Sequence, residues 1–381
     1  MRAPVGFPAL RQFYRARRVL VTGHTGFKGS WLALWLARLG AEVYGFALPP
    51  DQGPDNLYDR AGVAAAVRTA EIDLRSAQAV LCYLQQVQPQ LVFHLGARAW
   101  VQQGYEDPLA TFATNTLGTA HVLEAARQTA SVEAVVCVTT DKVYRDHDGD
   151  RPYRESDELG GLDPYSASKA AAELVARCYG HTLHPERRFA LATARGGNVI
   201  GGGDWSPHRI VPDIVRAIRD AQPLRLRRPE ATRPWQHVLD LSYAYLLLGY
   251  RLAATDRADG RQDEVDQAWN LGPDADAEMT VAGLVAAFLA GWGRPDYPVE
   301  RVAPPHHETT TLRLDSSRAN EVLGWRPLLN GPPAIEWTAD WYRRYLQDTN
   351  AAARLVGEQL ERFEDMLVSN LSASVRTARV P

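Results

Sequence analysis

A tyrosine and a lysine four residues apart, Tyr165 and Lys169, form the most chemically suggestive pair in the sequence. Residues at this spacing lie on one face of a helix. An ammonium group near a phenol favours the phenolate, so Tyr165 could act as a base near neutral pH. A plain surface pair is the alternative. It is disfavoured because a strand pattern ending in Thr139 and Thr140 and a glycine-rich turn precede the pair.

That glycine-rich turn contains Gly23, Gly26 and Gly29, spaced three residues apart. In a dinucleotide-binding turn, one glycine allows the tight turn, one lets the backbone approach the pyrophosphate, and one allows close helix packing. The amides and dipole at the start of the next helix would then face the phosphates. We therefore expect a dinucleotide site here. Its predicted contacts are Gly23, His24, Thr25, Gly26, Phe27 and Lys28, with Tyr165 and Lys169 at the reactive end.

The end of the second strand favours NAD over NADP. The acidic residue that usually binds the ribose 2′-hydroxyl is missing, because residues 45–48 read Gly-Phe-Ala-Leu. No arginine stands there to accept a 2′-phosphate. Asp73 and Leu74 follow the next expected strand and could meet the adenine, although Asp73 is equally consistent with a surface carboxylate.

The elements that must position these residues alternate between strand and helix. This alternation predicts an α/β fold, a doubly wound parallel sheet of the Rossmann type with helices on both faces. The expected strands are residues 18–22, 41–46, 91–95, 134–139 and 189–195, and the expected helices are residues 30–39, 80–87, 108–129 and 165–179.

After Gly201-Gly202-Gly203 the elements become shorter and richer in proline, which predicts a second, smaller α+β domain that binds the substrate. The expected division is residues 1–195 for the NAD-binding domain with a returning segment at about 235–275, residues 196–234 and 276–345 for the substrate domain, and residues 346–381 for a peripheral C-terminal helix and tail.

Composition excludes several partners. The 381 residues carry 42 Lys and Arg against 45 Asp and Glu, a net charge of -3, so no basic surface for nucleic acid or acidic lipid is expected. No apolar run reaches the roughly 18 residues of a membrane span. The three cysteines lack Cys-x-x-Cys spacing, so we expect no metal site and a cytoplasmic location.

The glycine turn and the Tyr-x-x-x-Lys pair together resemble the extended short-chain dehydrogenase/reductase family of nucleotide-sugar epimerases and dehydratases. Within that family, the similarity is strongest to the branch that dehydrates CDP-glucose, and it covers about residues 15–345. The segments that carry it are residues 21–31, Thr139-Thr140-Asp141-Lys142, residues 160–165, residues 197–205, residues 233–238 and Leu323-Gly324-Trp325-Arg326-Pro327.

The resemblance implies an NAD-dependent lyase that converts CDP-glucose to CDP-4-keto-6-deoxyglucose and water. The C5 proton cannot be removed until C4 is a ketone, so Tyr165 would take the C4 hydroxyl proton while hydride passes to NAD. Thr140 would orient the sugar hydroxyl. By resemblance, Asp141 is the acid that protonates the departing C6 hydroxyl and Lys142 is the base at C5, before the hydride returns to C6.

Two of these implied roles have alternatives. A base lysine must be neutral, which requires burial or nearby cations, and Lys142 could instead only hold a phosphate or a carboxylate. Asp141 could be structural, since aspartate is common in turns. A 4-epimerase on the same fold would need Tyr165 and Lys169 but would have no use for Asp141 and Lys142. A non-catalytic NAD-binding scaffold is the rival from another class.

The substrate side is expected to contain Arg233, which suits a pyrophosphate because guanidinium matches phosphate oxygens. By resemblance, Asn198 contacts the diphosphate and His237 lies in the same motif as Arg233. Arg98 stands where the family usually has glutamine, and Trp100 adds bulk in the same loop. These departures are equally consistent with neutral drift on a packed loop and with a modified sugar or a different nucleotide. Members of the family commonly dimerise through two helices from each subunit, so a homodimer through residues 108–129 and 165–179 is expected.

Overall fold

A seven-stranded sheet forms the centre of the computed structural model, which describes residues 5–50, 53–147, 151–181, 189–254, 267–303 and 312–377. The strand order is β11-β6-β5-β4-β1-β2-β3, and every neighbouring pair is parallel. The strands are β1 (Arg18–Thr22), β2 (Glu42–Ala47), β3 (Arg68–Glu71), β4 (Leu91–His94), β5 (Ala134–Val138), β6 (Ala190–Gly196) and β11 (Ala268–Leu271).

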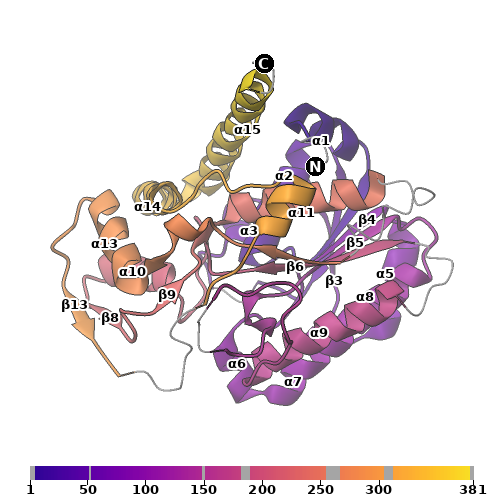
Figure 1. The fold of residues 1–381 in the computed structure, drawn as a ribbon, viewed down its shortest axis with the longest axis horizontal. Coiled ribbons are helices and arrows are strands. Elements are labelled where there is room, and N and C mark those ends of the chain that lie inside the picture. The colour runs from indigo at the N-terminus through magenta and orange to yellow at the C-terminus, as the bar shows by residue number, and fades with distance from the viewer. Residues whose placement is uncertain are drawn as a thin grey trace.

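Helices cover both faces of this sheet (Figure 1). Alternate residues of each strand point to opposite faces. Leu20 and Val135 therefore join the core under one helical layer, and Val21 and Val136 join the core under the other. The first layer is α5 (Ala77–Val87), α8 (Gly118–Arg127) and α9 (Pro164–His181), and the second is α2 (Phe27–Arg38) and α11 (Val238–Ala254). The expected doubly wound parallel sheet is confirmed.

The helix expected over residues 108–129 is interrupted. It consists of α7 (Pro108–Phe112), a π-helical segment η1 (Ala113–Leu117) and α8, and it follows α6 (Val101–Glu106). Within η1, the Asn115 side chain accepts a hydrogen bond from the Arg98 amide at 2.8 Å and donates to Ser168 Oγ at 2.9 Å. A π-bulge that re-aims one side chain is typical of functional regions. Here it ties the loop after β4 to α9.

Shorter elements gather beside the carboxyl ends of the sheet strands, on the left in Figure 1. Three small two-stranded sheets occur there among the described residues, pairing β7 with β10, β8 with β13, and β9 with β12. The elements are β7 (Val199–Ile200), α10 (Ile210–Arg219), β8 (Leu224–Leu226), β9 (Thr232–Arg233), β10 (Gln236–His237), β12 (Met279–Thr280), α13 (Val281–Trp292), β13 (Val299–Arg301) and α14 (Pro332–Gln347).

The two ends of the described chain pack against the α2 and α11 side of the molecule. α1 (Phe7–Tyr14) buries Leu10 and Tyr14, and α15 (Ala352–Thr377) buries Phe363 against Trp35. Trp35 Nε1 also donates to Glu364 at 3.0 Å. The tail residues 378–381 and residues 255–266 of the expected returning segment lie outside the described residues.

The remaining short elements connect these layers. They are α3 (Leu57–Arg60), α4 (Val63–Ala66), η2 (Asp141–Val143), η4 (Ala275–Ala277), η5 (Ala319–Leu323) and η6 (Thr349–Ala351). Over the part of the chain that the structure describes, no helix has the length and apolar character needed to cross a bilayer.

Candidate active site

Helix α9 and the end of β5 bring the predicted catalytic residues together. Asp163 precedes α9 and accepts a hydrogen bond from the Ser166 amide at 3.0 Å, and Pro164 opens the helix. Both features favour a helix start at this point. One turn later, Lys169 Nζ donates to the Val138 carbonyl at 3.0 Å. The tyrosine–lysine face of α9 is therefore held against the last residues of β5.

Burial dominates the acidities of this pair. Burial lowers the pKa of Lys169 to about 8, with the charges of Cys137 and Glu173 acting in the opposite direction. Burial raises the pKa of Tyr165, while a hydrogen bond with Thr140 and the charge of Arg209 oppose that rise. Such opposed environments around a phenol and an amine are typical of sites that move protons.

Asp141 lies in the same buried region, directly after Thr140. Its side chain is 2% exposed, and its Oδ1 accepts from Thr140 Oγ1 at 3.0 Å. Oδ2 has no hydrogen-bond partner among the described residues. It lies close to the Gly197 backbone, because a Cβ added to Gly197 would be only 3.3 Å from it. Burial raises the pKa of Asp141, opposed mainly by Lys142. A carboxyl group that burial keeps in its protonated form is suited to act as a general acid.

Two lysines near Asp141 differ in their surroundings. The Lys142 side chain is exposed, so protein packing does not supply the burial that a neutral base lysine requires. Lys28, from the glycine turn, is half-buried. This burial lowers the pKa of Lys28 to about 7, with the charges of Arg209 and Lys169 acting in the same direction and Asp141 opposing them.

The three glycines of the turn have the three environments that a dinucleotide cradle needs. Gly23 has a φ of 72°, and a Cβ there would lie 2.7 Å from the Gly96 backbone. A Cβ on Gly29 would lie 2.1 Å from the Gly23 carbonyl oxygen, so this glycine allows α2 to pack on the turn. A Cβ on Gly26, by contrast, would meet only that same oxygen at 3.5 Å. The open side at Gly26 and the uncapped start of α2 fit a pyrophosphate.

Other residues expected at the cofactor are placed differently. His24 is fully buried beneath the sheet surface, where its ring lies 2.5 Å from the position a Cβ on Gly45 would take. Burial lowers the pKa of His24 to about 4, so the ring is neutral. Only the His24 backbone is available to a ligand. Thr25 Oγ1 donates to the Leu48 carbonyl at 2.9 Å.

Asp73 and Leu74, expected near the adenine, lie beside the end of β4. The Asp73 carboxylate accepts two hydrogen bonds from Arg75 Nε, at 2.9 and 3.1 Å. This interaction with Arg75 lowers the pKa of Asp73. Leu74 is buried, and its Cδ1 lies 2.7 Å from the place a Cβ on Gly96 would take. Leu74 therefore packs next to the Gly23 turn.

Comparison with known proteins decides the family. The family model described as GDP-mannose 4,6 dehydratase matches residues 20–335. A CDP-glucose 4,6-dehydratase from Salmonella typhimurium is 36% identical over 88% of this chain and 93% of its own length. The chain belongs to the GDP-mannose 4,6-dehydratase family.

Other relatives agree with this membership. The structure of a dTDP-glucose 4,6-dehydratase from Streptomyces venezuelae, with NAD and TYD bound, has a TM-score of 0.70 at 25% identity and covers 86% of this chain and 97% of that one. A UDP-glucose 4-epimerase from Mycolicibacterium smegmatis is 27% identical over 87% of this chain and all of its own length. The expected family, fold class, NAD dependence and lyase class are confirmed.

In this dehydratase, the residues expected at the substrate separate into two groups. Arg233 and Asn198 are half-buried, and the charge of Arg233 lowers the pKa of Asp141, which places the guanidinium on the same side of the site. The Asn198 carbonyl accepts from the Gln236 amide at 3.0 Å. His237 is different: it is fully buried against Trp337, and its Nδ1 accepts from the Leu239 amide. His237 therefore has no surface to offer a ligand.

Arg98 is bound within the loop after β4. Its amide and carbonyl both bond to the side chain of Asn115, and its guanidinium approaches the Gln103 carbonyl at 3.5 Å. Its Nε is buried and has no partner among the described residues. The structure thus brings together Tyr165, Lys169, Thr140, Asp141, Lys28 and Arg233, whereas the side chains of His24 and His237 are completely buried.

Two charged residues of this region, Arg209 and Glu173, were not predicted from the sequence. Arg209 precedes α10, forms an ion pair with buried Asp204 at 3.3 Å, and lowers the pKa values of Tyr165 and Lys28. Its position four residues after the Gly201–Trp205 motif was the available signal. Glu173 lies one turn after Lys169 on α9 and is 4% exposed. Its spacing of four from Lys169 could have identified it.

Proposed function

We propose that this chain converts CDP-glucose to CDP-4-keto-6-deoxyglucose and water. The observation that carries the proposal is Asp141, directly after Thr140 and near Arg233: it is a buried carboxyl with a raised pKa, and its Oδ2 has no hydrogen-bond partner in the described part of the chain. An epimerase needs no such acid. The substrate is proposed from the identity of 36% with a CDP-glucose 4,6-dehydratase over nearly the full length of both chains.

The chain's own residues would divide the proton transfers. Tyr165, beside Thr140, would take the proton of the C4 hydroxyl, and the Lys169 ammonium would favour its phenolate. NAD, when bound at the glycine turn, supplies the reversible oxidation of the substrate. Asp141 Oδ2 would then give its proton to the departing C6 hydroxyl, and the carboxyl holds that proton beforehand because burial favours its protonated form.

The base that removes the C5 proton is proposed to be Lys142. Substrate binding must then enclose its exposed side chain, since a neutral lysine requires burial or nearby cations. In Lys142→Met, solvent deuterium should no longer exchange into C5, while oxidation at C4, followed by NADH absorbance, continues. Lys28→Met, assayed at saturating NAD, is the comparison. Loss of exchange only in Lys28→Met would transfer the role of base to Lys28, whose pKa is about 7.

Mass spectrometry tests the function as a whole. Incubations with CDP-, dTDP-, GDP- and UDP-glucose should show loss of one water from CDP-glucose alone. Loss of water from another nucleotide sugar would correct the substrate and keep the reaction. A product of unchanged mass with inverted C4 would establish the epimerase. No turnover of any of the four would support the scaffold alternative.

For the substrate side, we propose that Arg233 and Asn198 contact the diphosphate and that Arg98 lies near the sugar. Arg209 is added to this group because its charge reaches both Tyr165 and Lys28. Guanidinium groups suit phosphate oxygens. We propose the division into an NAD-binding part, residues 1–195 with 235–275, and a substrate-binding part, residues 196–234 and 276–345.

A homodimer is proposed through residues 108–129, which contain α7, η1 and α8, and through α9, and these elements pack against one another. These elements expose large apolar side chains: Leu109 is 83% exposed, Leu117 56% and Leu174 57%. Apolar groups concentrated on one exposed face favour burial against a second copy. We also propose a cytoplasmic location, which the three free cysteines, two of them exposed, support.

A further inference from the structure

A third residue continues the tyrosine–lysine face of α9. Glu173 follows Lys169 by four residues, as Lys169 follows Tyr165, so the three side chains lie on one face of the helix. The Glu173 side chain is almost completely buried. A buried carboxylate must be paired and hydrogen-bonded to remain charged. The partners of Glu173 therefore show which groups stabilise its negative charge.

Three consecutive residues at the end of β5 bind this face. The Val138 carbonyl accepts from Lys169 Nζ at 3.0 Å, Thr139 Oγ1 donates to Glu173 Oε1, and Thr140 bonds to Tyr165. The contacts involve Tyr165, Lys169 and Glu173 on successive turns of α9. The position of Glu173 is thus coupled to the strand end that carries Thr140.

The other oxygen of Glu173 is held by β6. Glu173 Oε2 accepts from Thr193 Oγ1 at 2.7 Å and from Arg195 Nη2 at 2.8 Å. The side chains of Glu173 and Arg195 are 3% and 4% exposed. Glu173 therefore accepts three hydrogen bonds from protein donors, one of them charged, and its geometry is fixed on both oxygens.

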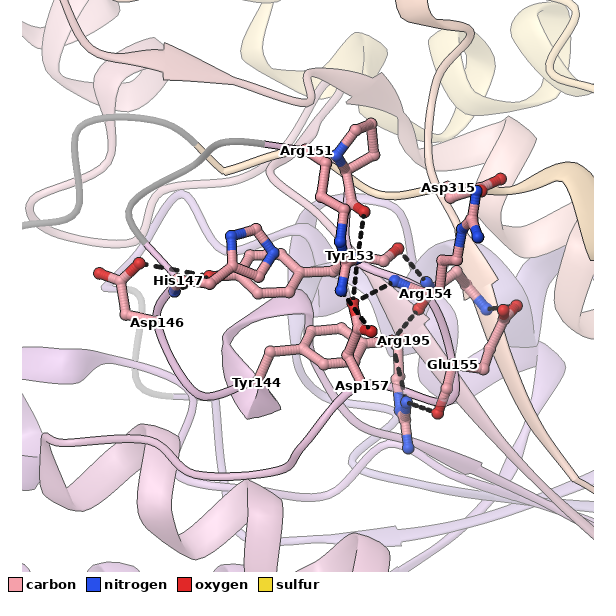
Figure 2. A network of polar contacts seen from close by, with 12 residues as sticks. Tyr144, Asp146, His147, Arg151, Tyr153, Arg154, Glu155, Asp157, Arg195 and Asp315 are labelled. Atoms are coloured by element: carbon pink, nitrogen blue, oxygen red, sulfur yellow. Dashed lines mark hydrogen bonds and ion pairs between the residues drawn. The ribbon is translucent and has the colours of Figure 1, made fainter.

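Arg195 carries the network to the segment that follows Asp141 and Lys142 (Figure 2). Its Nη1 donates to the Tyr144 hydroxyl at 2.8 Å and to the Glu155 carbonyl at 3.2 Å. The Tyr144 ring stacks on Tyr153 with centroids 4.8 Å apart, and the Tyr144 hydroxyl donates to Asn270 on β11. One buried network thus connects α9 with the segment that begins at the proposed acid and base.

We propose that Glu173 is a positioning residue: it holds Lys169 as a cation beneath Tyr165 and, through Arg195, fixes the segment after Asp141 against the sheet. The inference rests on the proposed roles of Tyr165 and Lys169. A carboxylate near an ammonium in a low-dielectric interior stabilises the charged amine. If Glu173 only joined α9 to the sheet, its charge would have no effect on proton transfer.

The charge effect has a definite sign. Burial lowers the pKa of Lys169 to about 8, and Cys137 and Glu173 oppose this lowering. Without the Glu173 charge, Lys169 would lose its proton at lower pH. Above that pH, the positive charge of Lys169 would no longer stabilise the phenolate of Tyr165. The alkaline limb of activity should therefore move to lower pH. The groups that face Lys169 are Tyr165, Glu173, Cys137, His94 and Lys28.

Glu173→Gln tests the charge while keeping the shape of the side chain. With saturating CDP-glucose, its alkaline limb of kcat should lie about one pH unit below that of the wild type, about a tenfold loss at pH above the limb. Because the variant leaves the Arg195 charge buried and unpaired, it could fail to fold. The double variant Glu173→Gln with Arg195→Met removes both charges, so it should recover stability and keep the shifted limb.

A matched control is Glu358→Gln on α15, which removes a carboxylate paired with Arg344 at the protein surface. Its profile should match the wild type. Thr139→Val removes one hydrogen bond to Glu173 and leaves its charge, so it should lower kcat without moving the limb. A double variant with recovered stability and a wild-type pH profile would overturn the proposal, and so would an unshifted Glu173→Gln.

A substrate-free readout separates this inference from the proposed function. The 13Cε chemical shift of Lys169, assigned by comparison with Lys169→Met, reports the titration of Lys169 directly. In Glu173→Gln, Lys169 should lose its proton at lower pH than in the wild type. If CDP-glucose is not turned over but this shift is present, only the proposed function fails. If turnover is present but neither shift is seen, only the inference fails.

Discussion

Gly26 and Gly29 lie three residues apart in the same turn, yet the structure assigns them opposite sensitivities. A Cβ on Gly29 would lie 2.1 Å from the Gly23 carbonyl oxygen and 2.8 Å from two further backbone atoms. Backbone cannot rotate away as a side chain can, so α2 and the turn would have to separate by about 1 Å. At Gly26 the nearest atom is 3.5 Å away, an ordinary contact.

The two substitutions should therefore affect different quantities. Overpacking of this kind costs about 3 kcal/mol. Alanine in the helix recovers up to about 1 kcal/mol, so Gly29→Ala should lower the free energy of unfolding by about 2 kcal/mol. Gly26→Ser places serine at the helix N-cap, a favoured position, so its unfolding free energy should stay within about 0.5 kcal/mol of the wild type.

NAD affinity, by contrast, should fall in Gly26→Ser, the variant whose stability is expected to stay close to that of the wild type. A side chain at Gly26 would occupy the side from which the pyrophosphate approaches the turn. Losing two charge-assisted hydrogen bonds from the turn amides would cost about 3 kcal/mol, which corresponds to about a hundredfold weaker binding. Gly26→Ser should therefore be folded and poor in NAD.

Urea unfolding and NADH fluorescence titration on the same preparations measure the two quantities. The wild type and an exposed substitution on α2, Arg38→Lys, serve as controls. Two results would refute these predictions: wild-type affinity for NAD in Gly26→Ser, or a wild-type free energy of unfolding in Gly29→Ala. Either result would mean that the turn does not have the glycine-specific clearances described above.

Three further predictions follow from the site and its surroundings. Tyr165→Phe should lower C4 oxidation of CDP-glucose by at least about a thousandfold per bound NAD, measured by NADH absorbance; normal oxidation would exclude Tyr165 as the base. Leu109→Glu with Leu174→Glu should give the mass of one chain by light scattering, whereas a dimer mass would reject the proposed interface. Burial lowers the pKa of His94 to about 3. Because unfolded histidine titrates near 6.5, the unfolded chain binds more protons between these values and stability should fall as pH drops below about 6.5; His94→Asn should flatten that fall in urea unfolding curves, and an unchanged slope would contradict it.

Much of the fold follows from local patterns. Short apolar strands, each followed by a glycine or a polar turn and then a helix, predict a parallel sheet because helices must cover both faces. The interruption of the helix over residues 108–129 could not be predicted in this way. The π-helical turn at Asn115 is stabilised by Arg98 and Ser168, which come from two other segments of the chain.

The site residues divide along the same line. Tyr165 and Lys169 are four residues apart in one helix, and the glycines act within one turn, so local spacing and the order of the neighbouring elements were enough to predict them. The same reasoning placed His237 near the substrate because it shares a motif with Arg233. The structure shows that the strand turns His237 into the core against Trp337, a contact with a helix a hundred residues later.

By itself, the sequence determined the parallel α/β fold, the dinucleotide turn and the tyrosine–lysine pair, since each depends on interactions between residues close along the chain. The tertiary structure alone decided which ionisable groups are buried, how burial shifts their pKa values, and which of them form ion pairs. The raised pKa of Asp141, the lowered pKa of Lys28 and the pairing of Glu173 with Arg195 depend on atoms from distant segments. Desolvation and charge pairing arise only once those segments are packed together, so no pattern in the chain could reveal them.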